Sequence, residues 1–182
     1  MGQKIAFSSR VGDRWSFAIE FEGVGDPPKA WNEWWGSLWL WVNGRVVGRP
    51  SEVEIVMTGL DSLAESASGF SRTNRLLSSL PANKAIDLVM WSRYGDDVRP
   101  DCLAGEDPLL LPQHEVLPRL TGPFFDGWEA ILITESCSER FLVRRTGSQA
   151  CEAVWPVGTF KRLVLQSRDW FERLASASLK SG

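Results

Sequence analysis

The sequence is poor in the side chains that build metal sites and thiol active sites. It has one histidine, His114, and three cysteines, Cys102, Cys137 and Cys151, among 182 residues. The cysteines share no metal-like spacing, so a tetrahedral zinc site is not expected. A catalytic thiol would need His114 as its partner, and the Leu-Pro-Gln-His-Glu context predicts a surface or capping role for this side chain. We therefore expect no metal, no thiol catalysis, and cysteines that are reduced and mostly buried.

Long apolar runs and the motifs of common enzyme families are also missing. No stretch approaches the roughly 20 apolar residues of a membrane-spanning helix, and the first residues contain no apolar core of a secretory signal. The patterns GxxxxGK[ST], GxGxxG, HExxH and GxSxG do not occur. The sequence thus predicts a cytoplasmic protein with no membrane segment, no cofactor and no catalytic residues of these types.

The net charge is only −3, but its distribution along the chain is uneven. Residues 1–94 carry ten basic and ten acidic side chains, residues 95–139 have a balance of −8, and residues 140–182 have a balance of +5. Phosphate contacts need clustered lysine and arginine, so the acidic middle argues against nucleic acid as the direct ligand.

Tyrosine occurs once, whereas tryptophan occurs ten times, and half of the tryptophans lie within residues 31–48. This stretch contains Asn43-Gly44 between apolar runs, which predicts a two-residue hairpin because both turn positions need a positive φ. The predicted strands are 37–42 and 45–48, with Val42 opposite Arg45 and Trp41 opposite Val46. Apolar residues on both faces predict a central strand with Trp39 and Trp41 in the core.

Apolar–polar alternation predicts a strand over 15–22, with Trp15, Phe17, Ile19 and Phe21 facing the core. Further strands are expected at 51–57, 128–135, 139–146 and 151–157, and helices at 58–67, 82–95 and 160–177. Segment 82–95 is apolar all round, so a buried strand remains its alternative. We expect one α+β domain over residues 1–182, in which an antiparallel sheet of two hairpins and an N-terminal strand is covered by helices.

Residues 96–127 hold five prolines and little periodicity, which predicts a long, irregular, acidic connection. Such loops are often functional, although an inert loop that aids solubility is the alternative. Two other interpretations remain open. Glu20 and Glu22 resemble the paired acids of a hydrolase, but a solvated strand face explains them more simply. Exposed tryptophans would suit a binder of small molecules or carbohydrates.

The hairpin and the strand before it carry a resemblance to a known family. The FAIEFE sequence at 17–22 precedes WGSLWLWVNGRVVG at 35–48, which matches the pattern W-G-x-L-x-L-W-V-x-G-x-x-x-G. This combination resembles the immunity protein 42 family of bacterial polymorphic toxin systems. The resemblance implies a cytoplasmic, non-catalytic protein that binds a cognate toxin and blocks it.

An acidic surface would suit such a role, because complementary charge speeds the encounter between two proteins. The acids chosen as candidate partner-binding residues are Asp96, Asp97, Asp101, Glu106 and Asp107. Three tryptophans just before the hairpin are the candidate apolar anchors, since aromatic hot spots often lie within a polar rim. These tryptophans are Trp31, Trp34 and Trp35.

Overall fold

The computed structural model of the chain describes residues 5–26, 28–68, 73–95, 108–117 and 123–180. They fall into two compact units. The first unit contains 5–26, 28–68, 123–126 and 160–180, and the second contains 73–95, 108–117 and 127–159. Antiparallel sheets with helices occur in both, which confirms the α+β class. The chain passes between the units four times, and a single cooperative domain over residues 1–182 stays a prediction.

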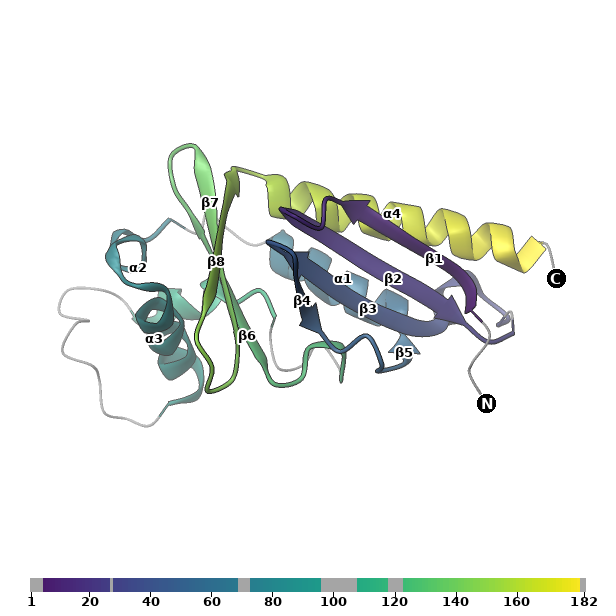
Figure 1. Cartoon of the computed structure of the whole chain (residues 1–182), viewed down its shortest axis with the longest axis horizontal. Helices are drawn as coiled ribbons and strands as arrows, with labels where there is room; N and C mark the ends of the chain where they lie inside the picture. Colours follow the sequence, from purple (N-terminus) through teal and green to yellow (C-terminus); the bar gives the residue numbers. More distant parts are fainter. Residues whose placement is uncertain (1–4, 27, 69–72, 96–107, 118–122, 181–182) are drawn as a thin grey trace. The chain divides into compact units, whose positions relative to one another are not determined.

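The sheet of the first unit is antiparallel and has the strand order β1–β2–β3–β4, with β5 pairing with β3 (Figure 1). The strands are β1 (Ile5–Gly12), β2 (Phe17–Val24), β3 (Trp35–Val42), β4 (Arg45–Gly48) and β5 (Glu54–Ile55). Strand β3 is therefore central, as its apolar residues on both faces predicted. The hairpin predicted at 128–146 lies in the other unit, so the two hairpins belong to separate sheets.

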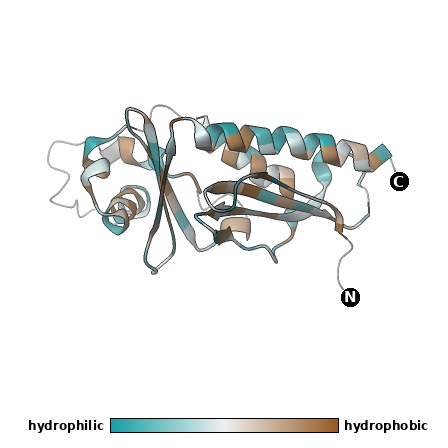
Figure 2. Ribbon diagram, turned by 45° about the horizontal axis from the view of Figure 1, so that its top comes forward, coloured by the Kyte–Doolittle hydropathy of each residue, from teal (hydrophilic) through white to brown (hydrophobic). Residues whose placement is uncertain are grey.

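One face of this sheet forms the apolar core of the first unit. Phe17, Ile19 and Phe21 are paired with Val42, Leu40 and Leu38, so all six side chains point the same way, and all are at most 1% exposed. Helices α1 (Val56–Ala67) and α4 (Thr159–Lys180) cover this face. Hydrophobic and hydrophilic residues alternate along α4 (Figure 2), whose buried stripe is Phe160, Leu163, Val164, Ser167, Phe171 and Ala175. Each fully buried large side chain contributes about 1.5–3 kcal/mol.

The hairpin has the predicted register and turn. Val42 pairs with Arg45, Trp41 pairs with Val46, and the φ angles of Asn43 and Gly44 are 49° and 77°. Positive φ at both positions is what a type I′ turn requires. Trp39 is buried at 7% exposure, as predicted, whereas Trp41 is only half-buried.

We expect Gly44→Val to destabilise the protein more than Asn43→Asp. A β-branched residue is strained at positive φ, and a Cβ on Gly44 would lie 2.8 Å from the ring of Trp15. Asp tolerates this region of φ, so the second variant keeps the turn. Thermal melts of both variants test the expectation, and equal melting temperatures would contradict it.

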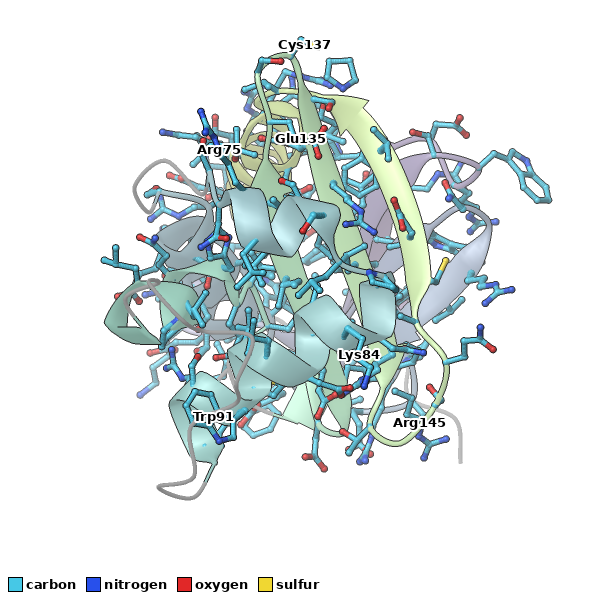
Figure 3. The ribbon with its side chains drawn as sticks, turned by 90° about the vertical axis from the view of Figure 1, so that its left-hand side faces the viewer. Arg75, Lys84, Trp91, Glu135, Cys137 and Arg145 are labelled. Carbon is cyan, nitrogen blue, oxygen red and sulfur yellow. The ribbon has the colours of Figure 1, made fainter. Side chains whose placement is uncertain are left out.

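The second unit is built on the three-stranded antiparallel sheet β6–β7–β8. Helices α2 and α3 lie across one face, with Cys137 at one end of the sheet and Arg145 at the other (Figure 3). Ile131, Ile133 and Leu142 pack there against the helices. The elements are β6 (Trp128–Thr134), β7 (Ser138–Arg145), β8 (Cys151–Pro156), α2 (Arg75–Ser79) and α3 (Ala82–Tyr94).

Two arginines of β7 tie the helices of the second unit to its sheet. Arg140 donates to the carbonyl oxygen of Leu80 at 2.9 Å, just after α2, and forms a two-bond ion pair with Glu152 of β8. The hydrogen bond from Arg140 lowers the pKa of Glu152 and, in return, raises the pKa of the arginine. Arg144 bridges Asp87 of α3 at 2.7 Å and Glu129 of β6 at 2.6 Å. Burial opposes its charge, but these bonds keep the pKa of Arg144 above its ordinary value.

The structure corrects three expectations about individual segments. The strand expected at 51–57 is reduced to β5, because α1 begins earlier, at Val56. His114 is fully buried, and its Nδ1 lies 2.9 Å from the carbonyl oxygen of Leu132, so it is neither a surface nor a capping residue. Cys137 is exposed and Cys151 half-buried, while Cys102 lies outside the described residues.

Residues 108–117, within the predicted irregular connection, are packed against the rest of the second unit. Residues Pro108–His114 form a 3-10 helix, η3, and Glu115 makes a β-bridge with Ile131. Leu111, Val116 and Leu117 are at most 1% exposed. Prolines interrupt the periodicity of this segment but not its burial, which is why the sequence pattern missed its role in the core.

Candidate functional site

The predicted partner-binding residues are placed very differently by the structure. The five acids, Asp96, Asp97, Asp101, Glu106 and Asp107, lie outside the described residues. Trp31 begins the 3-10 helix η1 (Trp31–Glu33) and is half-buried. Trp35 begins β3 and is 54% exposed. Trp34, between them, is 1% exposed and packs edge-on against Phe7 at 5.1 Å. It is thus a core residue and presents no ring to a partner.

Glu20 is part of a closed polar cluster on the sheet face opposite the helices. Arg14 donates to both of its carboxylate oxygens at 2.8 Å, and the indole nitrogen of Trp41 donates to Oε2 at 2.7 Å. The Arg14 guanidinium also lies 4.5 Å from the centre of the Trp41 ring. Glu20 is only 9% exposed, so the expectation of a solvated carboxylate was wrong. Its lone pairs are used by fixed donors, a structural role that does not favour the hydrolase interpretation.

Two turns lie side by side at the end of this sheet. The backbone nitrogens of Asn43 and Gly44 donate to the carbonyl oxygens of Ser16 at 2.9 Å and Arg14 at 2.8 Å. The turn between β1 and β2 is closed further by Asp13, whose carboxylate accepts from the nitrogen of Trp15 at 3.1 Å. These bonds hold the two turns rigidly together.

Trp15 stands out of the joined turns with 82% of its surface exposed. Sequence alternation placed it in the core, which is wrong because β2 begins only at Phe17. Gly12-Asp13 just before it is a turn signal that could have revealed this. Together with Arg14 and the half-buried Trp41, it forms what we call the turn patch: Arg14, Trp15 and Trp41. Tryptophan and arginine are among the side chains enriched in protein–protein hot spots.

Other kinds of site find less support in the described part of the chain. No group of three or more His, Cys, Asp and Glu side chains there could hold a metal ion. None of the described helices is long and apolar enough to cross a membrane. What the described residues do offer is an aromatic and cationic surface at two joined turns of the first unit, suited to contact with another molecule.

Comparison with known proteins identifies the family. The model of the family described as immunity protein 42 matches residues 7–170, from within β1 to within α4. The chain belongs to the immunity protein 42 family. This confirms the resemblance carried by the Trp-rich hairpin, and it extends the likeness across both units. No curated protein matches the chain.

A solved structure shares the fold of this immunity protein 42 family member. It is the crystal structure of CdiI from Burkholderia dolosa AUO158, with a TM-score of 0.62 and 16% sequence identity. The likeness covers 89% of this chain and 99% of that one. At 16% identity this likeness shows a shared fold only. The inference about function therefore rests on the family match.

Proposed function

We propose that this chain binds a cognate bacterial toxin in the cytoplasm and neutralises it by covering the toxin's active or substrate-binding surface. The observation that carries the proposal is the family match over residues 7–170. The turn patch supports it as well, because an exposed tryptophan beside an arginine is typical of a protein-binding surface. Binding alone accounts for inhibition, so no catalytic residue is required.

Co-expression tests the proposal directly. The product of the neighbouring reading frame is produced in a host cell with and without this chain, and growth is measured. Rescue of growth, together with a stable complex of the two purified proteins, is the expected result. Growth arrest that this chain does not relieve, with no complex formed, would overturn the proposal.

Trp15→Ala should weaken toxin binding while leaving the fold intact. Truncating a hot-spot tryptophan costs about 2 kcal/mol or more in binding, roughly a 30-fold rise in Kd. The side chain is 82% exposed, so the melting temperature should change little. Calorimetric titration against inactivated toxin measures the effect. A control is Val154→Ala, because Val154 is also exposed, at 58%, but belongs to β8 of the second unit and to neither the turn patch nor α4. A Kd unchanged by Trp15→Ala would remove the turn patch from the interface.

The five acids should act on the speed of binding. Replacing Asp96, Asp97 and Asp101 with Asn, and Glu106 and Asp107 with Gln and Asn, removes five of the ten acidic side chains in residues 95–139. If they steer a basic toxin, association slows and its salt dependence flattens, because rim charges act mainly on encounter. Stopped-flow kinetics at two ionic strengths provide the measurement. An unchanged association rate and salt slope would show that the toxin docks elsewhere.

A further inference from the structure

Strand β1 has an open edge that the proposed function leaves unexplained. Among the described residues, β1 pairs with β2 and with no other strand. Its residues are exposed or half-buried throughout. Unpaired strand edges are templates for pairing with another chain, and proteins usually block them with prolines, bulges, covering segments or several charges. The sequence of β1 from residue 7 to residue 12, FSSRVG, has no proline and a single charge, Arg10.

The register shows which backbone groups face outward. The nitrogen of Asp13 donates to the carbonyl oxygen of Phe17 at 3.0 Å, and this pair continues the register of Val11 with Ile19. In an antiparallel pair, hydrogen-bonded and non-hydrogen-bonded positions alternate. The N–H and C=O groups of Ser9 and Val11 therefore point to β2, and those of Ser8, Arg10 and Gly12 point away from the sheet. All three outward residues are exposed.

A groove of about 500 Å³ runs between this edge and helix α4, within the first unit. Ser9, Arg10 and Gly12 line it from the strand, and Asp169, Trp170 and Arg173 from the helix. The indole nitrogen of Trp170 donates to the hydroxyl oxygen of Ser9 at 2.7 Å, which ties helix to strand and sets the width of the groove. Arg173 lies 5.7 Å from the Trp170 ring, so aromatic, cationic and anionic groups meet there.

We propose that the groove between β1 and α4 accepts an extended segment of the toxin, which adds to the sheet as a further strand beside β1. The proposal rests on the proposed function, since it names how the same partner docks. The outward N–H and C=O groups of Ser8, Arg10 and Gly12 supply the main-chain bonds of strand addition. The strand leads directly into Asp13 and the turn patch, so one partner can engage both.

Charge defines the segment that fits. The residue paired with Arg10 has its side chain on the same face as Arg10, away from α4, and an acidic residue there completes the pair. Its two neighbours point toward α4, where the 42% exposed ring of Trp170 favours an apolar or aromatic side chain. The expected recognition element is thus an extended run with one carboxylate flanked by apolar residues.

The same charge argues against a second copy of this chain as the occupant. Two copies of β1 that pair antiparallel and use all three outward residues place Ser8 opposite Gly12 and Arg10 opposite Arg10. Like charges directly opposite one another on a sheet are destabilising. A toxin strand with an acidic residue at that position has no such penalty.

Hydrogen exchange of single amides provides the direct test. In the free protein, the amides of Ser8, Arg10 and Gly12 should exchange quickly, while those of Ser9 and Val11, bonded to β2, exchange slowly. Binding of inactivated toxin, the product of the neighbouring reading frame, should slow the three outward amides by about tenfold or more. Slowed exchange at all three outward amides is the pattern that strand pairing predicts, and unchanged exchange at these three amides in the complex would contradict it.

Two variants test the contribution of the edge to affinity. Ser8→Pro removes an outward N–H without removing a bond to β2, and edge positions tolerate proline. Arg10→Glu reverses the charge that selects the segment. Each should raise the Kd for inactivated toxin by about tenfold or more with an unchanged circular dichroism spectrum. The matched control is Lys161→Glu, the same charge reversal on the exposed surface of α4 outside the groove, which should leave the Kd unchanged.

The outcomes separate the two proposals. If the toxin binds and growth is rescued, but the outward amides and both variants show no effect, strand addition is wrong and the proposed function stands. If the free protein is a dimer in solution with its outward amides already protected, a second copy occupies the edge and the proposal is overturned. If no toxin binds the wild-type chain, the proposed function itself fails.

Discussion

Gly36→Ala is expected to lower the free energy of unfolding by about 3 kcal/mol or more, the upper end of overpacking effects. Gly36 lies in β3 opposite Gly23 of β2. A Cβ at this position would lie 1.7 Å from the carbonyl oxygen of Glu22 and 2.8 Å from a methyl group of Val56. The first contact is with backbone, which cannot rotate away, so β2 and β3 would have to separate. Urea denaturation followed by tryptophan fluorescence measures the loss.

Gly25→Ala is the matched control for Gly36→Ala. Gly25 belongs to the same unit and has a φ of 84°, but nothing lies within 4 Å of an added Cβ. Its replacement therefore costs only the backbone strain of a left-handed conformation, about 1–2 kcal/mol. If both variants lose the same stability, close strand approach is not the reason for glycine at position 36.

Trp34→Ala should destabilise the protein by about 3–5 kcal/mol, as large aromatic truncations in cores do. The side chain is 1% exposed, and its ring packs against Phe7, which in turn packs against Phe171 of α4 at 5.6 Å. Removing the indole leaves a cavity between η1, β1 and the helix. Calorimetry or urea denaturation gives the change in the free energy of unfolding.

The adjacent tryptophan is an internal control. Trp35 is 54% exposed, so Trp35→Ala should cost less than about 1 kcal/mol. Because the two side chains are neighbours in sequence and identical in chemistry, their difference in cost reports burial alone. A loss of several kcal/mol for Trp35→Ala, or below about 1 kcal/mol for Trp34→Ala, would contradict the placement of these rings. Trp35→Ala also separates binding from stability, since any loss of toxin affinity would arise without unfolding.

The tryptophans of this immunity protein 42 family member thus divide into folding and surface groups. Trp34 and Trp39 are buried in the first unit, while Trp15, Trp35 and Trp170 keep between 42% and 82% of their surface exposed. Trp41 belongs to neither group, because it is half-buried: the Arg14 guanidinium lies over its ring, and its indole nitrogen donates a hydrogen bond to Glu20. Variants of the exposed group are therefore the ones that can reveal a partner without unfolding the protein.

Local patterns were sufficient to predict most of the secondary structure. Asn43-Gly44 determined the hairpin and its register, because few residues adopt positive φ and the turn fixes which residues face each other. The strands predicted at 128–135 and 139–146 and the helix predicted at 160–177 likewise correspond to β6, β7 and α4. The resemblance to the family, carried by the strand at 17–22 and the Trp-rich hairpin, was confirmed by the family match. These features depend on backbone geometry within a few residues, which sequence records directly.

Burial and partners of single side chains were decided by the tertiary structure. Trp15 and Trp34 look alike in the sequence, yet one projects from a turn and the other fills the core. Glu20 is desolvated because Arg14, in the preceding turn, folds back over it, and His114 is buried because η3 packs against β6. The groove beside β1 exists only because α4, more than 140 residues later in the sequence, packs next to that strand. Such contacts depend on which distant segments meet, and a local pattern of residues carries no information about that choice.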